Sequence, residues 1–105
     1  MPAASSPSPE VVAGWLASLS PGAVAIAVLG PDGAVLAGDP ELGARATRAL
    51  EDAPGVRGIT SRSAPAVMVV ARDGDRAVAI ELPAPALPGL ARADLAAALD
   101  LLGGG

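Results

Sequence analysis

The segment APAVMVVARDGDRAVAIEL, Ala64 to Leu82, decides the fold, because it holds two apolar runs separated by Arg-Asp-Gly-Asp-Arg. Asp-Gly between alternating apolar residues predicts a β-hairpin. With Asp73 and Gly74 as the two loop residues, Val69 pairs with Val78. One face of this hairpin then carries Val67, Val69, Val78, Ile80 and Leu82, and the other carries Met68, Val70, Ala77 and Ala79. Because both faces are apolar, we expect each to be covered by a helix or by another chain.

The elements around this hairpin are predicted from caps, turns and apolar periodicity. Ser8-Pro9-Glu10 and Asp39-Pro40-Glu41 each have the N-cap, first-turn proline and acidic residue typical of a helix start. The predicted elements are a helix from Ser8 to about Ser20, a hairpin over Ala23 to Ala37, a helix from Asp39 to about Ala53, a polar strand over Val56 to Ser63, the central hairpin, and a helix over Leu90 to Leu102. Residues 1–7 are expected to form a disordered lead and residues 8–103 a single domain.

The fold class predicted from this order is α+β, as an α/β sandwich with a five-stranded antiparallel sheet. Its order is helix-strand-strand-helix-strand-strand-strand-helix. We expect the first and third helices on one face of the sheet and the second helix on the other. If Val69 and Ile80 are core residues, replacing either by alanine should cost about 1 to 4 kcal/mol.

Composition excludes several classes of function. The chain has no cysteine and no histidine, so it lacks thiolate ligands, the commonest metal ligand and the usual general base. Its net charge is −4, and its seven arginines are scattered, which argues against a nucleic-acid surface. The N-terminus has no apolar signal region and no apolar run is long enough to cross a bilayer. We therefore expect a cytoplasmic protein without metal, cofactor, nucleic-acid partner or membrane insertion.

Four short motifs suggest chemistry but have simpler explanations. Asp73-Gly74-Asp75 lacks the further carboxylates of a calcium loop, so we interpret it as a turn. Asp39 and Glu41 are explained by helix capping, and Ser61 and Ser63 have no neighbouring base. Gly30-Pro31-Asp32-Gly33 is followed by a strand and lacks the lysine of a phosphate loop.

Trp15 is the only aromatic residue of the chain. It lies on the apolar stripe of the first helix with Val11, Val12, Leu16 and Leu19. The two alternatives for Trp15 are core packing, which we favour, and a cap over a ligand.

Three segments together resemble the roadblock/dynein light chain family. They are LSPGAVAIAVLGPDGAVLAG (Leu19 to Gly38), MVVARDGDRAVAIEL (Met68 to Leu82) and PALPGLARADLAAALDLL (Pro85 to Leu102). The resemblance implies a roadblock/profilin-like fold and a non-catalytic regulator that forms homodimers and works with a small Ras-like GTPase. It also implies that any stimulation of GTP hydrolysis proceeds without an arginine finger, and it carries no catalytic residue over to this chain.

In relatives the second helix and the strand after it form the dimer surface. The corresponding helix here is short and the strand is polar, which changes the expected geometry. The narrow stripe of small residues on this helix still favours close approach of a second copy. Our candidate interface residues are Leu42, Ala46, Ala49, Leu50 and Ile59, and our candidate partner surface consists of Arg45, Arg57, Arg62 and Arg72.

Two other classes of function remain as alternatives. One is a small-ligand-sensing domain of the profilin-like or GAF/PAS-like kind, with a cavity over the face of Val67, Val69 and Ile80. Ligand pockets combine apolar walls with convergent polar groups, which that face lacks. The other alternative is an enzyme, for which the chain offers almost no nucleophile or base.

Overall fold

The computed structural model of the chain describes residues 8–20, 22–63, 66–83 and 88–102. Five strands form one sheet in the order β2-β1-β5-β4-β3, and every neighbouring pair is antiparallel. The elements in chain order are α1 (Pro9–Leu19), β1 (Ala25–Leu29), a 3-10 turn η1 (Pro31–Gly33), β2 (Val35–Gly38), α2 (Pro40–Asp52), β3 (Gly58–Ser63), β4 (Ala66–Asp73), β5 (Arg76–Pro83) and α3 (Pro88–Leu102). The predicted fold class and element order are confirmed. The predicted disordered lead, residues 1–7, lies outside the described residues.

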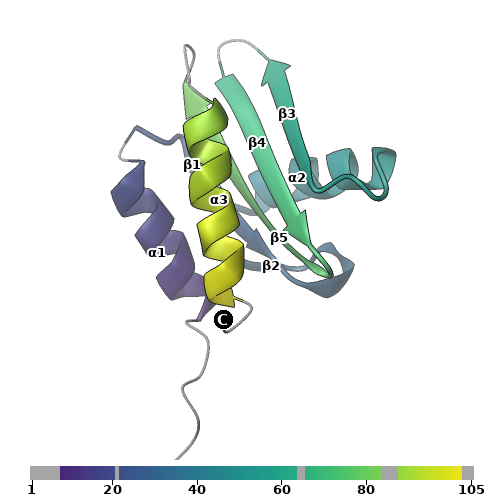
Figure 1. The fold of residues 1–105 in the computed structure, drawn as a ribbon, viewed down its shortest axis with the longest axis horizontal. Coiled ribbons are helices and arrows are strands. Elements are labelled where there is room, and N and C mark those ends of the chain that lie inside the picture. The colour runs from purple at the N-terminus through teal and green to yellow at the C-terminus, as the bar shows by residue number, and fades with distance from the viewer. Residues whose placement is uncertain (1–7, 21, 64–65, 84–87, 103–105) are drawn as a thin grey trace, which may run out of the picture.

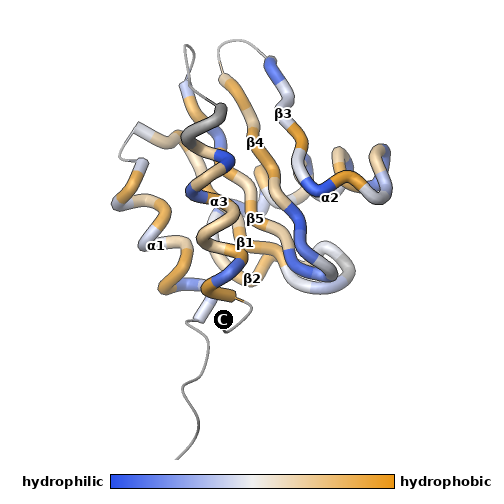
Figure 2. Tube along the Cα trace, in the orientation of Figure 1, coloured by the Kyte–Doolittle hydropathy of each residue, from blue (hydrophilic) through white to orange (hydrophobic). Residues whose placement is uncertain are grey.

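The sheet is covered by helices on both faces, as predicted. In Figure 1, α1 and α3 lie in front of the sheet and α2 lies behind it. Two apolar clusters fill the two layers, and Figure 2 shows the central strands as mostly hydrophobic. The first cluster joins Val12 and Leu16 of α1 and the α3 residues Ala91, Leu95, Ala98, Leu99 and Leu102 to Val28, Val67, Val69, Val78 and Ile80. The second joins Leu42, Ala46 and Leu50 of α2 to Ala27, Leu29, Val70, Ala77 and Ala79.

The first two helices begin where their capping residues predict. The Ser8 side chain accepts a hydrogen bond from the backbone N–H of Val11, and Asp39 accepts one from the N–H of Glu41. In each helix a proline follows the cap, where its missing N–H removes no helical hydrogen bond. These caps explain Asp39 and Glu41 without any catalytic role.

The predicted register of the central hairpin is wrong by two residues. Asp73 pairs with Arg76, so Gly74 and Asp75 form the loop, and Val69 pairs with Ile80 instead of Val78. A two-residue hairpin loop requires a positive φ at its first position, and Gly74 adopts φ +63° there without steric cost. The shift of two residues keeps every side chain on its predicted face, because strand faces alternate with a period of two.

The apolar stripe of α1 is narrower than predicted. Val12 and Leu16 are buried, but Val11 is 60% exposed and Leu19 is 46% exposed. The reason is that α3 lies beside α1 and covers the rest of the same sheet face, so only one edge of α1 reaches the core. Trp15 is half-buried and packs against this cluster, which agrees with the core-packing interpretation.

Two elements begin at slightly different residues than predicted. Helix α3 begins at Pro88, two residues earlier than predicted, and the strand predicted from Val56 begins at Gly58. Among the described residues, no helix combines the length and the hydropathy that crossing a membrane requires.

Candidate functional site

Strand β3 is an edge strand, and its only neighbour in the described sheet is β4. Arg57 O accepts a hydrogen bond from Arg72 N, at 2.7 Å, and Ile59 pairs with Val70. Bonded and non-bonded pairs alternate along an antiparallel ladder, so Arg57, Ile59 and Ser61 direct their backbone groups toward β4. The N–H and C=O groups of Gly58, Thr60 and Arg62 therefore point away from the sheet, where another strand can pair with them.

The structure changes the predicted dimer surface. Leu42 and Ala46 are 0% exposed and Leu50 is 8% exposed, because all three pack against the chain's own sheet in the second cluster. These three side chains are therefore core residues, and their assignment to an interface with a second copy is corrected. Ala49 and Ile59 are half-buried, so they remain candidates.

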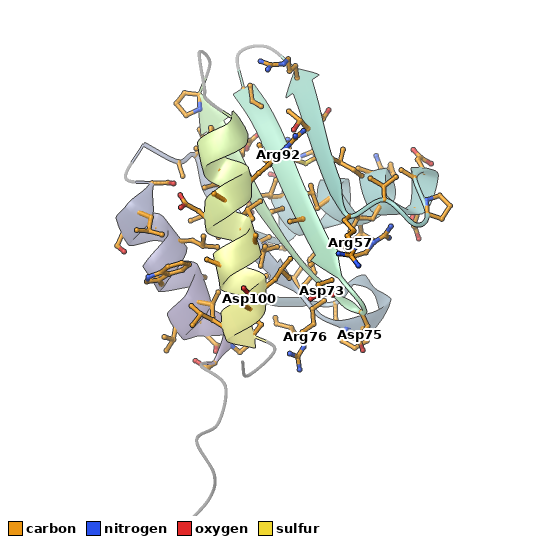
Figure 3. The ribbon with its side chains drawn as sticks, in the orientation of Figure 1. Arg57, Asp73, Asp75, Arg76, Arg92 and Asp100 are labelled. Carbon is orange, nitrogen blue, oxygen red and sulfur yellow. The ribbon has the colours of Figure 1, made fainter. Side chains whose placement is uncertain are left out.

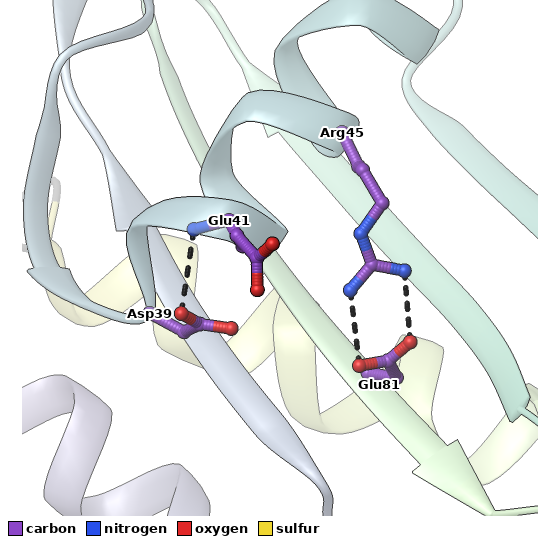
Figure 4. Close-up of polar contacts among 4 residues, drawn as sticks. All are labelled: Asp39, Glu41, Arg45 and Glu81. Atoms are coloured by element: carbon purple, nitrogen blue, oxygen red, sulfur yellow. Dashed lines mark hydrogen bonds and ion pairs between the residues drawn. The ribbon is translucent and has the colours of Figure 1, made fainter.

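Arg45, a candidate partner residue, is bound within the chain. Its Nη1 and Nη2 atoms donate to the two carboxylate oxygens of Glu81 on β5, at 2.8 and 3.0 Å (Figure 4). The Glu81 side chain is 14% exposed and that of Arg45 is 46% exposed. This two-point contact raises the pKa of the Arg45 guanidinium and lowers the pKa of the Glu81 carboxyl. The pair fixes α2 on the sheet and engages both Nη atoms of Arg45, although the side chain stays half exposed.

We expect the Arg45–Glu81 pair to give the protein a pH-dependent stability. Because the folded pKa of Glu81 lies below its ordinary value of 4.5, the unfolded chain binds the proton more readily. The contribution of the pair is therefore complete above pH 4.5 and disappears as the pH falls through the lowered pKa. At neutral pH, Arg45→Ala should cost about 1 kcal/mol or less, since Arg45 is half exposed to solvent.

Urea unfolding between neutral and acidic pH measures this effect. The difference between wild type and Arg45→Ala should shrink toward zero at the acidic end. Arg48→Ala, an exposed arginine on the same helix, is the matched control and should be nearly neutral at every pH. A constant difference for Arg45→Ala across the whole range would contradict the assignment.

Arg72 also has a structural role that the sequence did not reveal. Its Nη2 atom donates to the carbonyl oxygens of Ala53, at 3.2 Å, and Val56, at 2.8 Å. These bonds hold the connection between α2 and β3 against the central hairpin. Arg57, directly before β3, and Arg62, near the end of β3, are exposed, so these two predicted partner residues remain candidates.

Two further arginines, Arg76 and Arg92, form hydrogen bonds between the sheet and α3. This structural role was not predicted. Arg76 donates to the carbonyl oxygen of Leu102 at the C-terminal end of α3, and Arg92 of α3 donates to Thr60 Oγ1 at 2.6 Å. Figure 3 shows Arg76 with Arg57, Asp73 and Asp75 at the turn end of the central hairpin. No sequence signal predicts these bonds, since their partners lie 26 and 32 residues away.

A groove of about 620 Å³ lies on the α2 side of the sheet, and we call it the hairpin groove. Its walls are the turn between β1 and β2, the second half of α2, and the turn between β4 and β5. Leu29, Leu50 and Ala77 of the second cluster form its floor. Its polar lining residues are Thr47, Glu51, Arg72, Asp75 and Arg76. The ligand cavity suggested by the sequence was placed on the opposite face, where α1 and α3 leave Val67, Val69 and Ile80 at most 2% exposed.

The described residues place the sequence motifs that suggested chemistry in turns, caps and an edge strand. They contain no group of three or more Asp or Glu side chains that could hold a metal ion. Asp73 and Asp75 lie at the hairpin turn. Ser61 lies on the edge strand β3, and the sequence contains no histidine or lysine that could act as its base. Two surface features of the described residues are candidate binding sites, the outer edge of β3 and the hairpin groove.

Comparison with solved structures identifies the fold. The structure superposes with a TM-score of 0.68 on the crystal structure of a Roadblock/LC7 domain from Streptomyces avermitilis. The match covers 87% of this chain and 91% of that chain, at 14% sequence identity. The chain has the fold of a Roadblock/LC7 domain.

This Roadblock/LC7 fold agrees with the resemblance that the three sequence segments indicated. No family model matches the sequence, and neither does any curated protein. At 14% identity the likeness establishes the arrangement of helices and strands, while the partner must be argued from the chain's own surface.

Proposed function

We propose that the chain is a non-catalytic, cytoplasmic, homodimeric module that binds a small Ras-like GTPase and modulates its GTP hydrolysis. The Roadblock/LC7 fold and the sequence resemblance both support this proposal. The main support for a homodimer is the outer edge of β3, where the backbone groups of Gly58, Thr60 and Arg62 face away from the sheet. Antiparallel pairing of two such edges would extend the sheet across both copies.

The dimer would bring together the half-buried side chains on the α2 side of this edge. Ile59 lies on that side of β3, and Ala49 lies on α2. Because only Gly58, Thr60 and Arg62 face outward, these three residues must pair with the same three of the second copy. A register centred on Arg62 would place the two Arg62 side chains directly opposite each other, and like charges there are destabilising, so we expect a register centred on Thr60, with Gly58 opposite Arg62.

We expect the wild-type chain to have about twice the 10.1 kDa mass of one chain in light scattering at high micromolar concentration. Arg62→Pro should shift the equilibrium toward monomer, because proline removes an outward N–H without breaking a bond to β4. Arg62→Ala keeps that N–H and is the matched control. A monomeric wild type, or equal effects of the two variants, would contradict pairing through β3.

A second pair of variants tests the helix side of the interface. Ala49→Arg places a charge on the half-buried position of α2, whereas Ala44→Arg places it on an exposed position of the same helix. The first variant should weaken the dimer and the second should not. Ala46→Arg is unsuitable, since Ala46 is a core residue and its replacement would unfold the monomer.

The GTPase partner is tested with a purified Ras-like GTPase from the same genome, in its GTP-bound and GDP-bound forms. Arg57→Ala and Arg62→Ala should each weaken binding modestly, and the effect should be smaller at high salt. Neither should lower stimulated turnover by the roughly thousandfold that loss of an arginine finger causes. A variant that binds normally but abolishes stimulation would refute the mechanism, and a dimer that binds none of these GTPases would refute the partner.

A further inference from the structure

The face of β3 on the α1 and α3 side of the sheet is open to solvent. Thr60 pairs with Val69, whose side chain packs in the first cluster, so the Thr60 side chain points to the same side. Gly58 and Arg62 share this side, because side chains alternate along a strand with a period of two. Gly58 and Arg62 are exposed and Thr60 is half-buried. Helix α3 therefore leaves this margin of the sheet uncovered.

Arg92 of α3 reaches this open margin. Its Nη2 atom donates to Thr60 Oγ1 at 2.6 Å, and Figure 3 shows the side chain extending from α3 toward the β3 side. The bond leaves the other guanidinium N–H groups of Arg92 and the O–H of Thr60 free to donate. Among the described residues the ion pair joins Arg45 to Glu81, so neither Arg62 nor Arg92 is paired there with a carboxylate.

The carboxylates of the neighbouring elements lie away from this margin. Asp94 is two residues from Arg92 on α3, which places it about 200° around the helix and on the opposite flank. Asp100 is eight residues from Arg92, or about 12 Å along the helix axis. Asp73 is four residues along β4 from Val69, or roughly 13 Å. The positive charge beside Thr60 therefore has no close acidic neighbour among the described residues.

The homodimer of the proposed function, on which this inference rests, would double that charge. In the register centred on Thr60, the two Thr60 residues exchange both backbone hydrogen bonds, with their Cα atoms about 5.5 Å apart. The two Arg92 guanidinium groups, each bound to its own Thr60, would then meet across the two-fold axis. Arg62 would lie opposite Gly58 of the second copy, which has no side chain to cover the axis. Like charges so close repel each other unless an anion lies between them.

We propose that the two-fold axis binds one phosphate group, held by Thr60 and Arg92 of both copies, and that this anion strengthens the dimer. The guanidinium fork matches phosphate oxygens in a two-point contact. A tetrahedral phosphate has a two-fold axis of its own, so it presents two oxygens to each copy. Its dianion offsets both Arg92 charges, which a single carboxylate does not. The site exists only in the dimer, because each copy supplies half of the donors.

The test is the dissociation constant of the dimer, measured by sedimentation in chloride and in inorganic phosphate at equal ionic strength. Equal ionic strength makes general screening the same in both buffers. A ligand that binds only the dimer shifts the equilibrium toward it, so 10 mM phosphate should tighten the wild-type dimer about fivefold or more. Calorimetry should give one phosphate for every two chains. Acetate should act as chloride does, and an acetate effect equal to that of phosphate would overturn the assignment.

Arg92→Gln separates an anion site from a purely structural role. This variant removes both the repulsion and the site, so its dimer in chloride should be at least as tight as that of wild type. Phosphate should then change its dissociation constant by less than about twofold. Arg48→Gln, at an exposed position of α2, is the matched control and should respond to phosphate as wild type does. Equal weakening of the Arg92→Gln dimer in both buffers would overturn the proposal.

The remaining outcomes separate this site from the proposed function. A wild-type dimer that phosphate leaves unchanged would overturn the anion site and leave the homodimer standing. A chain that is monomeric in both buffers would overturn both. N-acetyl-O-phosphoserine N-methylamide distinguishes the two sources of the phosphate group. Tighter binding of this probe than of inorganic phosphate would assign the site to a phosphorylated protein segment, and weaker binding would assign it to the free ion.

Discussion

Replacing Ile80 by alanine should lower the free energy of unfolding by about 2 to 5 kcal/mol. Ile80 is 1% exposed on β5, between its cross-strand partners Ile26 and Val69, and lies beneath α1 and α3. Truncation loses the transfer free energy of the removed carbons. It also leaves a cavity, because strands on both sides and helices above limit relaxation. Urea unfolding followed by circular dichroism measures the change directly.

Leu36→Ala is the matched control for this prediction. Leu36 lies on the edge strand β2 and is 44% exposed, so removing its side chain should cost about 1 kcal/mol or less. Equal losses at Ile80 and Leu36 would show that the two-layer core does not form in solution as described.

The sequence predicted those parts of the fold that depend on local chemistry. Ser8 and Asp39 determine their helix starts through hydrogen bonds to residues two or three positions away, so a short window contains the whole signal. The alternation of side chains along the strands likewise assigned Val67, Val69 and Val78 to one face of the hairpin and Met68 and Val70 to the other. The strand order was not predicted. The pairing of β1 with β5 joins Ala25 to Glu81, and no local pattern encodes that contact.

The predicted register of the central hairpin was wrong because the two loop residues were placed one position too early. Asp-Gly was taken as the loop, whereas Gly74 takes the first loop position and Asp75 the second. A type I′ turn favours Asp-Gly as its two loop residues, whereas a type II′ turn takes glycine first, so the motif alone allowed both registers. The faces were right because an error of two residues does not change them.

The candidate site was predicted less well, because its residues were chosen by type and exposure. The apolar stripe of α2 was read as a surface for a second copy, but apolar periodicity cannot distinguish a sheet of the same chain from a partner. Leu42, Ala46 and Leu50 face the sheet. Arg45 and Arg72 were read as partner residues, yet a carboxylate 36 residues away and two backbone carbonyls already bind them. Bonds from side chains to distant groups leave no pattern in the sequence.

The second large effect is expected at Gly38, the last residue of β2. Gly38 has φ +93°, and a Cβ atom there would collide with the backbone carbonyl oxygen of Ile26. That same oxygen accepts the N–H of Asp39, at 2.8 Å, and Asp39 caps α2. Gly38→Ala therefore disturbs the β1–β2 pairing and the start of α2 together. The positive φ costs about 1 to 2 kcal/mol and the collision about 1 to 3 more, so we expect a loss of roughly 2 to 5 kcal/mol.

Gly74→Ala separates these two contributions. Gly74 has φ +63°, but a Cβ atom there would have no heavy atom within 4 Å, so only the backbone cost of about 1 to 2 kcal/mol remains. Thermal and urea unfolding of both variants should rank Gly38→Ala as the less stable. If the two alanine variants were equally stable, the close approach of β2 to Ile26 would be wrong. The path by which β2 turns into α2 would then also differ from the one described.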